Sequence, residues 1–282
     1  MKFQVSSQLD YEVRFPSTLI LNIHALRTPA QSVLAETFTV EPYVRIEEFT
    51  SVNGENRFAR MEVNERMNFR IAYRATVDTH PKTINLDESL ENVPVVRLDG
   101  SIIPFLFPSR YCQSDKLYRM AYNQFGRIEG VANQVLAIAD WIYENVEYLS
   151  GSTNAQTSAY DTIAERAGVC RDFAHLGVAL CRALTIPARY FTGYAYQLSP
   201  PDFHACFEAF IGGQWILFDA TRLAPLNGLV KIATGRDAAD AAVASIFGNV
   251  VCTALKVDCQ VVDPGFVPFA YDRANLKGLS YR

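Results

Sequence analysis

The chain has 282 residues, of which 49% are hydrophobic and 20% are charged. This composition excludes wholesale disorder, and the length is enough for two modest domains or one large domain. The formal net charge of −4 argues against a general nucleic-acid-binding protein, which would carry a basic patch or a basic domain.

The first residues, "MKFQVSSQLDYEVRF", lack the continuous apolar core of a secretion signal. No apolar run approaches the roughly 20 residues that a membrane-spanning helix needs. We therefore expect a cytoplasmic protein without a membrane partner. Residues 1–88 alternate apolar and polar positions in short runs, as in "YEVRF" and "FRIAYRATVD", and this period of two predicts an all-β N-terminal domain. The "NGEN" sequence at 53–56 predicts a hairpin turn within it.

Residues 89–115 carry several prolines and little periodicity, which predicts an ordered connector. The following residues, 116–282, are expected to form a second domain. Within it, apolar side chains recur at three- and four-residue steps along 131–146 and predict a helix. A polar loop, "GSTNAQTSAYDT", comes next and is typical of segments that line active sites.

A second helix is predicted to begin at Cys170 and to end before Pro187, because proline cannot continue a helix. Its apolar face is formed by Phe173, Leu176, Gly177, Leu180 and Leu184. A structural thiol would be expected within this apolar stripe. Cys170 instead lies at the helix start, where backbone N–H groups have no partners within the helix.

The region after this helix contains several predicted strands. Residues 188–196 form the first, and 204–221 form two strands joined by a turn at Gly212 and Gly213. The tail is predicted to contain a helix over "GRDAADAAVASIFG", with Asp237 near its start as a capping residue, and a strand near "VVCTALKVDCQVV".

The register of the 204–221 hairpin has a chemical consequence. If Gly212 and Gly213 are the two turn residues, Cys206 lies opposite Asp219 and His204 lies opposite Thr221. Side chains two residues apart share one face of a strand, so all four project from the same side. His204 and Asp219 are then diagonal neighbours about 7–8 Å apart at the backbone, within side-chain reach.

A carboxylate beside an imidazole fixes the tautomer of the ring and stabilises its charged form. Cys170 is the candidate nucleophile, because a helix N-terminus and a nearby histidinium both favour a thiolate. His175 follows Cys170 by five residues and is rotated by about 140° around the helix, so we interpret it as a structural residue. Arg171 and Asp172 are expected to form local ion pairs.

Two stretches, "GVCRDFAHLGVALCRALTIPARYFTGY" and "FHACFEAFIGGQWILFDAT", resemble the transglutaminase-like superfamily, with its Cys-His-Asp triad. Further similarity to bacterial proteins of this group, described as cysteine proteases, spans nearly the whole chain. The resemblance implies that Cys170 is the nucleophile, His204 the base and Asp219 the orienting acid. The chain departs from the usual pattern at Cys206, where an aromatic residue is common, and at Ala220, where proline is common.

The expected architecture is therefore α+β, with an N-terminal β domain followed by a papain-like, transglutaminase-type catalytic domain. The expected activity is acyl transfer at the amide bond of a peptide or protein substrate. Hydrolysis of a peptide or isopeptide bond is the first choice, with protein-glutamine cross-linking as the alternative. An arylamine N-acetyltransferase and a non-catalytic interaction module are the other candidates.

Neither a cofactor nor a metal is predicted. A zinc site formed by Cys170, His204 and Cys206 is disfavoured, since structural zinc ligands come in close pairs at other spacings. Calcium is also disfavoured, because the chain has no EF-hand loop.

Overall fold

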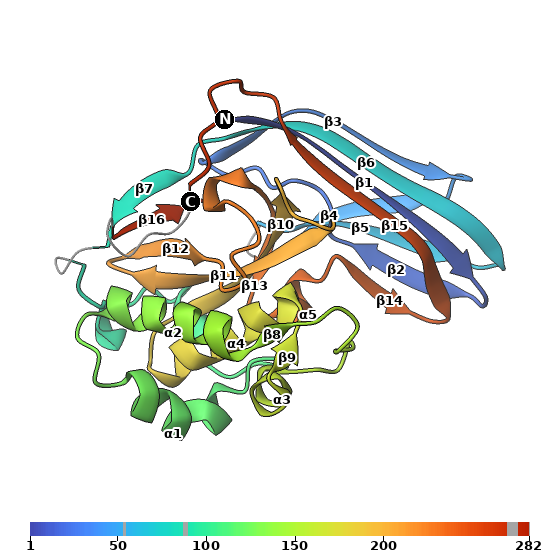
Figure 1. Cartoon of the computed structure of the whole chain (residues 1–282). Helices are drawn as coiled ribbons and strands as arrows, with labels where there is room; N and C mark the ends of the chain where they lie inside the picture. Colours follow the sequence, from blue (N-terminus) through green and yellow to red (C-terminus); the bar gives the residue numbers. More distant parts are fainter. Residues whose placement is uncertain (53–54, 87–89, 270–275, 282) are drawn as a thin grey trace.

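The computed structural model describes residues 1–52, 55–86, 90–269 and 276–281. In this part of the chain, hydrogen-bonded strands form two four-stranded sheets, one six-stranded sheet and one two-stranded sheet. The long strands lie on one side of the molecule, and the helices gather on the other (Figure 1). No helix among these residues is long and apolar enough to cross a bilayer. The α+β class is confirmed.

The first two sheets build the β-rich part of the molecule. One sheet has the order β15-β1-β6-β3, and the other has the order β14-β2-β5-β4. Their strands are β1 (Lys2–Val13), β2 (Ser17–Leu21), β3 (Gln31–Glu41), β4 (Ile46–Thr50), β5 (Arg57–Val63), β6 (Met67–Thr79), β14 (Ala244–Phe247) and β15 (Val250–Val261). The predicted turn at 53–56 includes residues 53–54, which lie outside the described residues, but the flanking β4 and β5 pair antiparallel.

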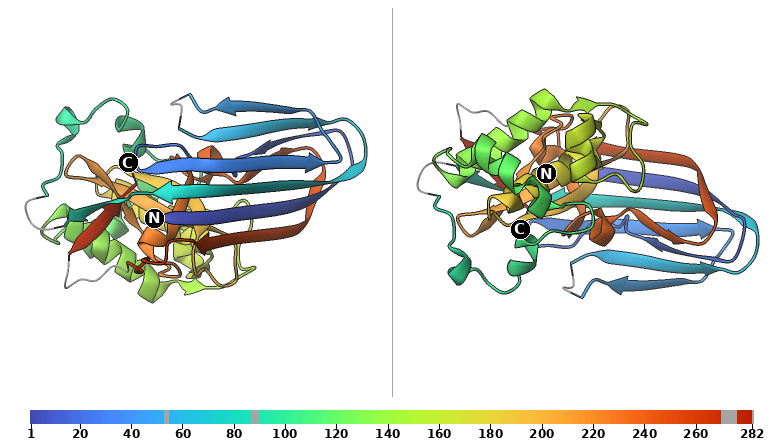
Figure 2. Two further views of the ribbon diagram at one scale, coloured as in Figure 1. Left: turned by 90° about the horizontal axis from the view of Figure 1, so that it is seen from above. Right: turned by 90° about the horizontal axis from the view of Figure 1, so that it is seen from below.

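Alternation along these strands explains their packing. In β1, every second side chain is buried, including Phe3, Leu9 and Val13, while the intervening polar residues are largely solvent-accessible. The buried faces of the two sheets share one apolar core, and this core also includes residues of the six-stranded sheet such as Tyr194 and Val230. The β-rich part is therefore packed directly against the part that carries the candidate site (Figure 2).

The six-stranded sheet has the order β13-β10-β11-β12-β16-β7. Its strands are β7 (Lys82–Asn85), β10 (Ala188–Ala195), β11 (Phe203–Ile211), β12 (Gln214–Phe218), β13 (Leu229–Gly235) and β16 (Lys277–Ser280). A second core joins this sheet to the helices. These helices are α1 (Ser114–Phe125), α2 (Val131–Asn145), α3 (Ala159–Glu165) and α4 (Cys170–Ala183).

The short elements connect these layers. The connector contains the 3₁₀ turns η1 (Val95–Arg97) and η2 (Ile103–Leu106), and η3 (Leu226–Gly228) precedes β13. The two-residue strands β8 (Glu147–Tyr148) and β9 (Ala167–Gly168) pair in parallel beside the start of α4. The predicted helices at 131–146 and from Cys170 are thus present as α2 and α4.

The helix predicted over 235–248 is wrong for most of its length. Helix α5 covers only Ala238–Ala241, and the chain continues as strand β14, which pairs with β2. Asp237 does cap this short helix, because its Oδ1 accepts a hydrogen bond from the Ala239 N–H at 2.8 Å. Pairing with an available sheet edge has overridden the helical tendency of this alanine-rich segment.

The sheets also cross the predicted domain boundaries. Strands β14 and β15 lie within 116–282 but belong to the sheets of the N-terminal part, while β7 lies within 1–88 but belongs to the six-stranded sheet. The ranges 1–88, 89–115 and 116–282 remain a prediction as domains, but hydrogen bonding does not follow them. The C-terminal strands tie the two parts together.

Candidate active site

The start of α4 places Cys170 at the end of a short extended segment. Gly168 in β9 pairs with Tyr148 in β8, and the backbone of Val169 is extended before the helix begins. A Cβ atom at position 168 would lie 2.8 Å from the Cβ of Asp172, so only glycine fits there without displacement. This explains why a glycine stands two residues before the half-buried Cys170.

Asp172 holds this helix start in place. Its side chain is fully buried, and its Oδ2 accepts hydrogen bonds from the Val169 N–H at 3.0 Å and the Thr153 hydroxyl at 2.7 Å. Its Oδ1 accepts hydrogen bonds from the Arg171 guanidinium at 2.9 and 3.1 Å. Arg171 also donates to the Asn154 carbonyl at 2.8 Å. The predicted local ion pair is confirmed, and it joins the polar loop to the start of α4.

We expect the substitution Asp172→Asn to lower the free energy of unfolding by about 2–3 kcal/mol, because an amide N–H would face either the Val169 N–H or the guanidinium. Urea unfolding measures this loss. The matched control is Asp161→Asn, since Asp161 caps α3 through Ser158 in the same way at a more accessible position. A loss of about 1 kcal/mol is expected for the control. Equal losses in the two variants would contradict this role for Asp172.

The predicted hairpin register is confirmed. Ile211 pairs with Gln214 and Phe207 pairs with Phe218. Both turn glycines have positive φ angles, 58° at Gly212 and 79° at Gly213, as a tight two-residue turn requires. This register brings the side chains of His204 on β11 and Asp219, directly after β12, onto one face.

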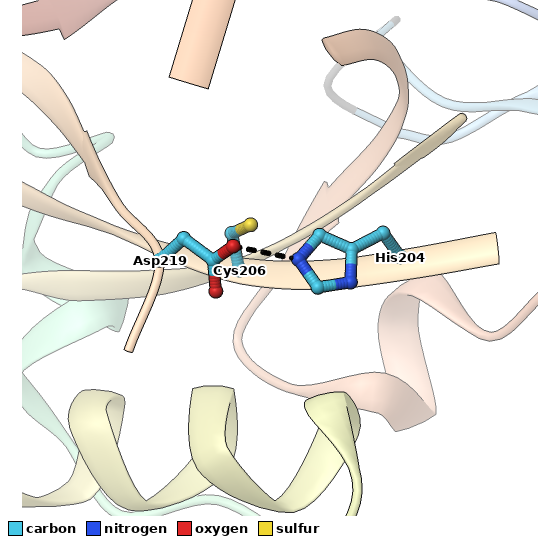
Figure 3. Close-up of side chains that lie close together, drawn as sticks. All are labelled: His204, Cys206 and Asp219. Carbon is cyan, nitrogen blue, oxygen red and sulfur yellow. Dashed lines mark hydrogen bonds and ion pairs between the residues drawn. The ribbon is translucent and has the colours of Figure 1, made fainter. Parts of the chain in front are cut away.

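The imidazole of His204 points at the carboxylate of Asp219, and the Nε2–Oδ2 distance is 2.8 Å (Figure 3). The other oxygen, Oδ1, accepts hydrogen bonds from the Thr221 N–H at 2.9 Å and from its hydroxyl at 2.7 Å. Both side chains of the pair are at most 2% exposed. The carboxylate is therefore held in a fixed orientation, with one oxygen committed to the ring.

The electrostatics of this pair favour the charged forms. Burial alone lowers the pKa of His204, but the charge and hydrogen bond of Asp219 outweigh it and raise the pKa well above 6.5. Burial likewise raises the pKa of Asp219, yet the interactions with His204 and Thr221 bring it below 3.8. At neutral pH the imidazolium–carboxylate pair is the stable state of these two residues.

The second ring nitrogen of His204, Nδ1, is buried and has no hydrogen-bond partner within the described part of the chain. The interaction with the side chain of Cys170 is among the causes that raise the pKa of His204. The thiol itself donates to the carbonyl of Phe203, with Sγ at 4.0 Å from the oxygen, one residue before His204. The structure thus brings Cys170, His204 and Asp219 to one place.

Tyr148 is a site residue that the sequence interpretation missed. Tyr148 pairs with Gly168, which precedes Cys170 by two residues, and this pairing places Tyr148 beside the start of α4. Burial raises the pKa of Tyr148 to about 12, the charge of Cys170 adds to this, and the charge of His204 acts against it. The two-residue pairing of β8 with β9 that places Tyr148 carries no readable sequence pattern.

His175 lies outside this arrangement, as expected. Its ring is fully buried between the rings of Tyr111 and Tyr190, at centroid distances of 5.0 Å. Its Nε2 accepts a hydrogen bond from the Ala238 N–H at 3.1 Å. Burial lowers the pKa of His175 to about 3, so the ring is neutral and structural.

Cys206 lies beside the pair, and the ligand atoms of His204, Cys206 and Asp219 all lie within 4.8 Å of one another (Figure 3). Such donors could in principle hold a metal ion. However, Nε2 and Oδ2 are joined directly by their hydrogen bond, and burial raises the pKa of the Cys206 thiol to about 12. Binding a metal through these atoms would require breaking the His204–Asp219 hydrogen bond and deprotonating the Cys206 thiol.

Two family models match the chain. Residues 1–101 match the N-terminal domain of bacterial transglutaminase, and residues 119–220 match the transglutaminase-like superfamily. The second match contains Cys170, His204 and Asp219. It therefore covers all three residues that the structure brings together.

One solved structure is similar over the whole chain. It is described as a "Putative Cysteine Protease" from Cytophaga hutchinsonii, is 65% identical, and has a TM-score of 0.98. The alignment covers 100% of this chain and 98% of that one.

Curated relatives match shorter segments. Uncharacterized protein ML0607 of Mycobacterium leprae is 30% identical over 116 residues, which are 38% of this chain and 42% of the relative. Uncharacterized protein Rv2569c of Mycobacterium tuberculosis is 41% identical over 64 residues, 23% of this chain and 20% of the relative. The chain thus spans less than half the length of the curated relatives it matches. Together with the family models and the full-length structural match, these similarities show that the chain belongs to the bacterial branch of the transglutaminase-like superfamily.

Proposed function

We propose that this protein is a cysteine-dependent amide hydrolase that cleaves a peptide or isopeptide bond. The transglutaminase-like fold supports cysteine-dependent acyl transfer in general. The observation that carries the proposal is the orientation of His204. Asp219 engages Nε2 at 2.8 Å, which leaves Nδ1 without a hydrogen-bond partner among the described residues and free to exchange a proton with the Cys170 thiol.

In the proposed reaction, the proton of the Cys170 thiol resides on Nδ1 of His204 in a thiolate–imidazolium pair, and the thiolate attacks the amide carbonyl carbon. The resulting C–S bond leaves a negative charge on the carbonyl oxygen. Collapse of this intermediate breaks the C–N bond, and the leaving amine takes the proton from Nδ1. Water, deprotonated by the same nitrogen, then attacks the thioester, so that a carboxylate is released and the thiol is restored.

The acceptor decides between hydrolysis and cross-linking. A primary amine that reached the thioester in place of water would give a new amide bond, with the same three residues in the same roles. The similarity to a protein described as a cysteine protease favours water as the acceptor. The proposed substrate is a peptide or protein, and the cytoplasmic location stays a prediction.

The reaction type is tested with glutamine-containing peptides and isopeptide-linked peptides, each incubated with and without a primary amine. Mass spectrometry separates cleavage of the chain or isopeptide bond, amine incorporation, and ammonia release alone. Bond cleavage that is absent from Cys170→Ala supports the proposal. Amine incorporation in preference to cleavage would replace it by transamidation. Absence of every product, combined with equally slow iodoacetamide labelling of all accessible cysteines, would indicate a non-catalytic module.

We expect Tyr148→Phe to lower kcat/KM about 100-fold, because Tyr148 lies beside the helix start at Cys170 and its hydroxyl would donate to the developing oxyanion. Alkylation of Cys170 by iodoacetamide forms no oxyanion, so its rate should change little. Peptide turnover and alkylation are therefore measured on the same preparation. If both rates fall together, Tyr148 acts on the thiol and not on the oxyanion.

A further inference from the structure

A cavity lies away from the candidate active site, between the β14-β2-β5-β4 sheet and the six-stranded sheet. Its volume is about 630 Å³, which is in the range of small-molecule sites. Arg189, one of its lining residues, pairs with Glu208 across β10 and β11, whereas Gly193 pairs with His204. Four residues of strand therefore separate the cavity from the imidazole, about 13 Å along β10.

The walls of this cavity are mostly apolar. They include six large apolar or aromatic side chains from six separate elements, namely Ile20, Phe49, Phe58, Phe105, Trp215 and Phe247. The rings of Phe49 and Phe58 stack with centroids 5.2 Å apart, and Phe247 is 63% exposed. An apolar body of the size of a phenyl ring would find contacts on several sides.

Two buried polar groups in the wall lack partners. The Arg189 side chain is 4% exposed and lies over the Trp215 ring, with its guanidinium carbon 4.3 Å from the ring centroid. Its Nε donates to Glu208 at 2.5 Å, but its Nη2 and the Nε1 of Trp215 have no hydrogen-bond partner anywhere in the described ranges. A buried N–H group without a partner is unfavourable, and an acceptor from a ligand would satisfy it.

The charges beneath the wall point to an anion. Arg189 and Lys231 both contact Glu208, and all three side chains are more than nine-tenths buried. Two buried cations thus share one buried carboxylate. The pKa of Lys231 is lowered by burial to about 8, so it is still largely protonated at neutral pH.

A second carboxylate near Arg189, that of Glu55, lies at the cavity rim. Its carboxylate lies 3.6 Å from Nη1 of Arg189, which is too long for a hydrogen bond, and its side chain is 35% exposed. Asp240 also lines the cavity but is already paired with Arg236. Because two carboxylates border the cavity, a ligand with one negative charge fits better than a doubly charged phosphate.

We propose that this cavity binds a small monocarboxylate with an apolar body. The carboxylate accepts hydrogen bonds from Arg189 and Trp215, and the apolar body packs against the aromatic wall. The ligand could be the C-terminal carboxylate of a peptide that ends in an apolar residue, or a free arylalkyl carboxylate. Both share the chemistry that the cavity recognises. This site is independent of the proposed hydrolase activity.

Trp215 provides the reporter for a test. The chain has two tryptophans, so Trp141→Phe leaves Trp215 as the sole indole. In this variant, fluorescence is titrated with N-acetylphenylalanine, 3-phenylpropionate and N-acetylphenylalaninamide. We expect saturable changes with the two acids and at least about tenfold weaker binding of the amide. Tighter binding of N-acetylphenylalanine than of 3-phenylpropionate would identify a peptide C-terminus as the ligand type, and the reverse order would identify a free carboxylate.

Two further variants test the role of the charges. Glu55→Gln removes a competing carboxylate from the rim, and we expect it to strengthen binding of the acids several-fold without affecting the amide. Arg189→Gln should abolish the preference for acids, and circular dichroism checks that it folds. Equal binding of acid and amide, no binding of either acid, or unchanged affinity in Glu55→Gln would each overturn the proposal. The Glu55 variant keeps the test decisive if the Arg189 variant does not fold.

Discussion

Replacing His204 by glutamine is expected to reduce turnover by about 10⁵-fold. Glutamine can still donate a hydrogen bond to Asp219, so the buried carboxylate keeps a partner and the fold is spared. It cannot take a proton from Cys170 or return one to the leaving amine. The loss therefore measures proton transfer and the support of the thiolate, which are the functions assigned to the imidazole.

Iodoacetamide labelling followed by peptide mass mapping provides the second measurement for this variant. Selective fast alkylation of Cys170 in the unmodified protein should be lost in His204→Gln. Cys252 is exposed and remote in sequence, so its labelling should not change and serves as an internal control. Persistent fast labelling of Cys170 in the variant would show that the thiol is activated without the imidazole.

The pH dependence of labelling follows from the raised pKa of His204 and the lowered pKa of Asp219. The imidazolium is present at neutral pH and persists until the pH rises through the raised value, while the carboxylate is lost only below 3.8. The ion pair is therefore fully formed between 3.8 and 6.5, the ordinary values of the two groups. Between about pH 8 and pH 6, we expect Cys170 labelling to decline less than Cys252 labelling, because the imidazolium sustains the thiolate. Parallel declines would contradict this.

Asp219→Asn is expected to lower turnover by about 10³–10⁴-fold. The Thr221 N–H and hydroxyl occupy one carboxylate oxygen, so an asparagine would keep its carbonyl oxygen there and turn its NH₂ group toward His204. Nε2 would then have to accept a hydrogen bond, and the ring proton would move to Nδ1. That nitrogen could no longer accept the thiol proton.

The matched control for this variant is Asp237→Asn. Asp237 is also buried and accepts hydrogen bonds from two backbone N–H groups, those of Ala239 and Tyr111. Its replacement should lower thermal stability without affecting the His204 tautomer, so turnover below the melting temperature should be nearly unchanged. Nitrogen-15 NMR of the histidine rings reports the tautomer directly. An unchanged His204 tautomer in Asp219→Asn would exclude this explanation of the lost activity.

Much of the candidate site could be predicted from the sequence, because the relation between its residues within each element depends on local backbone geometry. The parity of a two-residue turn places His204 and Asp219 on one face, and the observed pairing of Ile211 with Gln214 follows that rule. Helix periodicity separates Cys170 from His175 on α4, and the ring of His175 is enclosed between two tyrosines. In both cases the backbone geometry of one element fixes the relation between the residues.

The same rules failed where the structure of a segment depends on pairing with a strand that is distant in sequence. The alanine-rich stretch after Asp237 favours a helix locally, but its second half becomes β14 because the edge of β2 offers backbone partners. Strand β15 was expected, yet its place beside β1 could not be predicted, since strand alternation does not specify a partner. Tyr148 was missed for the same reason.

The α+β class, the start of α4 at Cys170 and the register that brings His204 and Asp219 onto one face could be predicted from the residues alone. Each of them depends on backbone periodicity or turn geometry within a short segment. Three contacts could be found only in the folded molecule: the Cys170 thiol lies beside the strand of His204, Tyr148 lies beside both, and Arg189 lies over Trp215 in a cavity between sheets. These contacts join segments far apart in the chain, and they arise from the packing of the sheets and helices around shared cores. No local pattern encodes them.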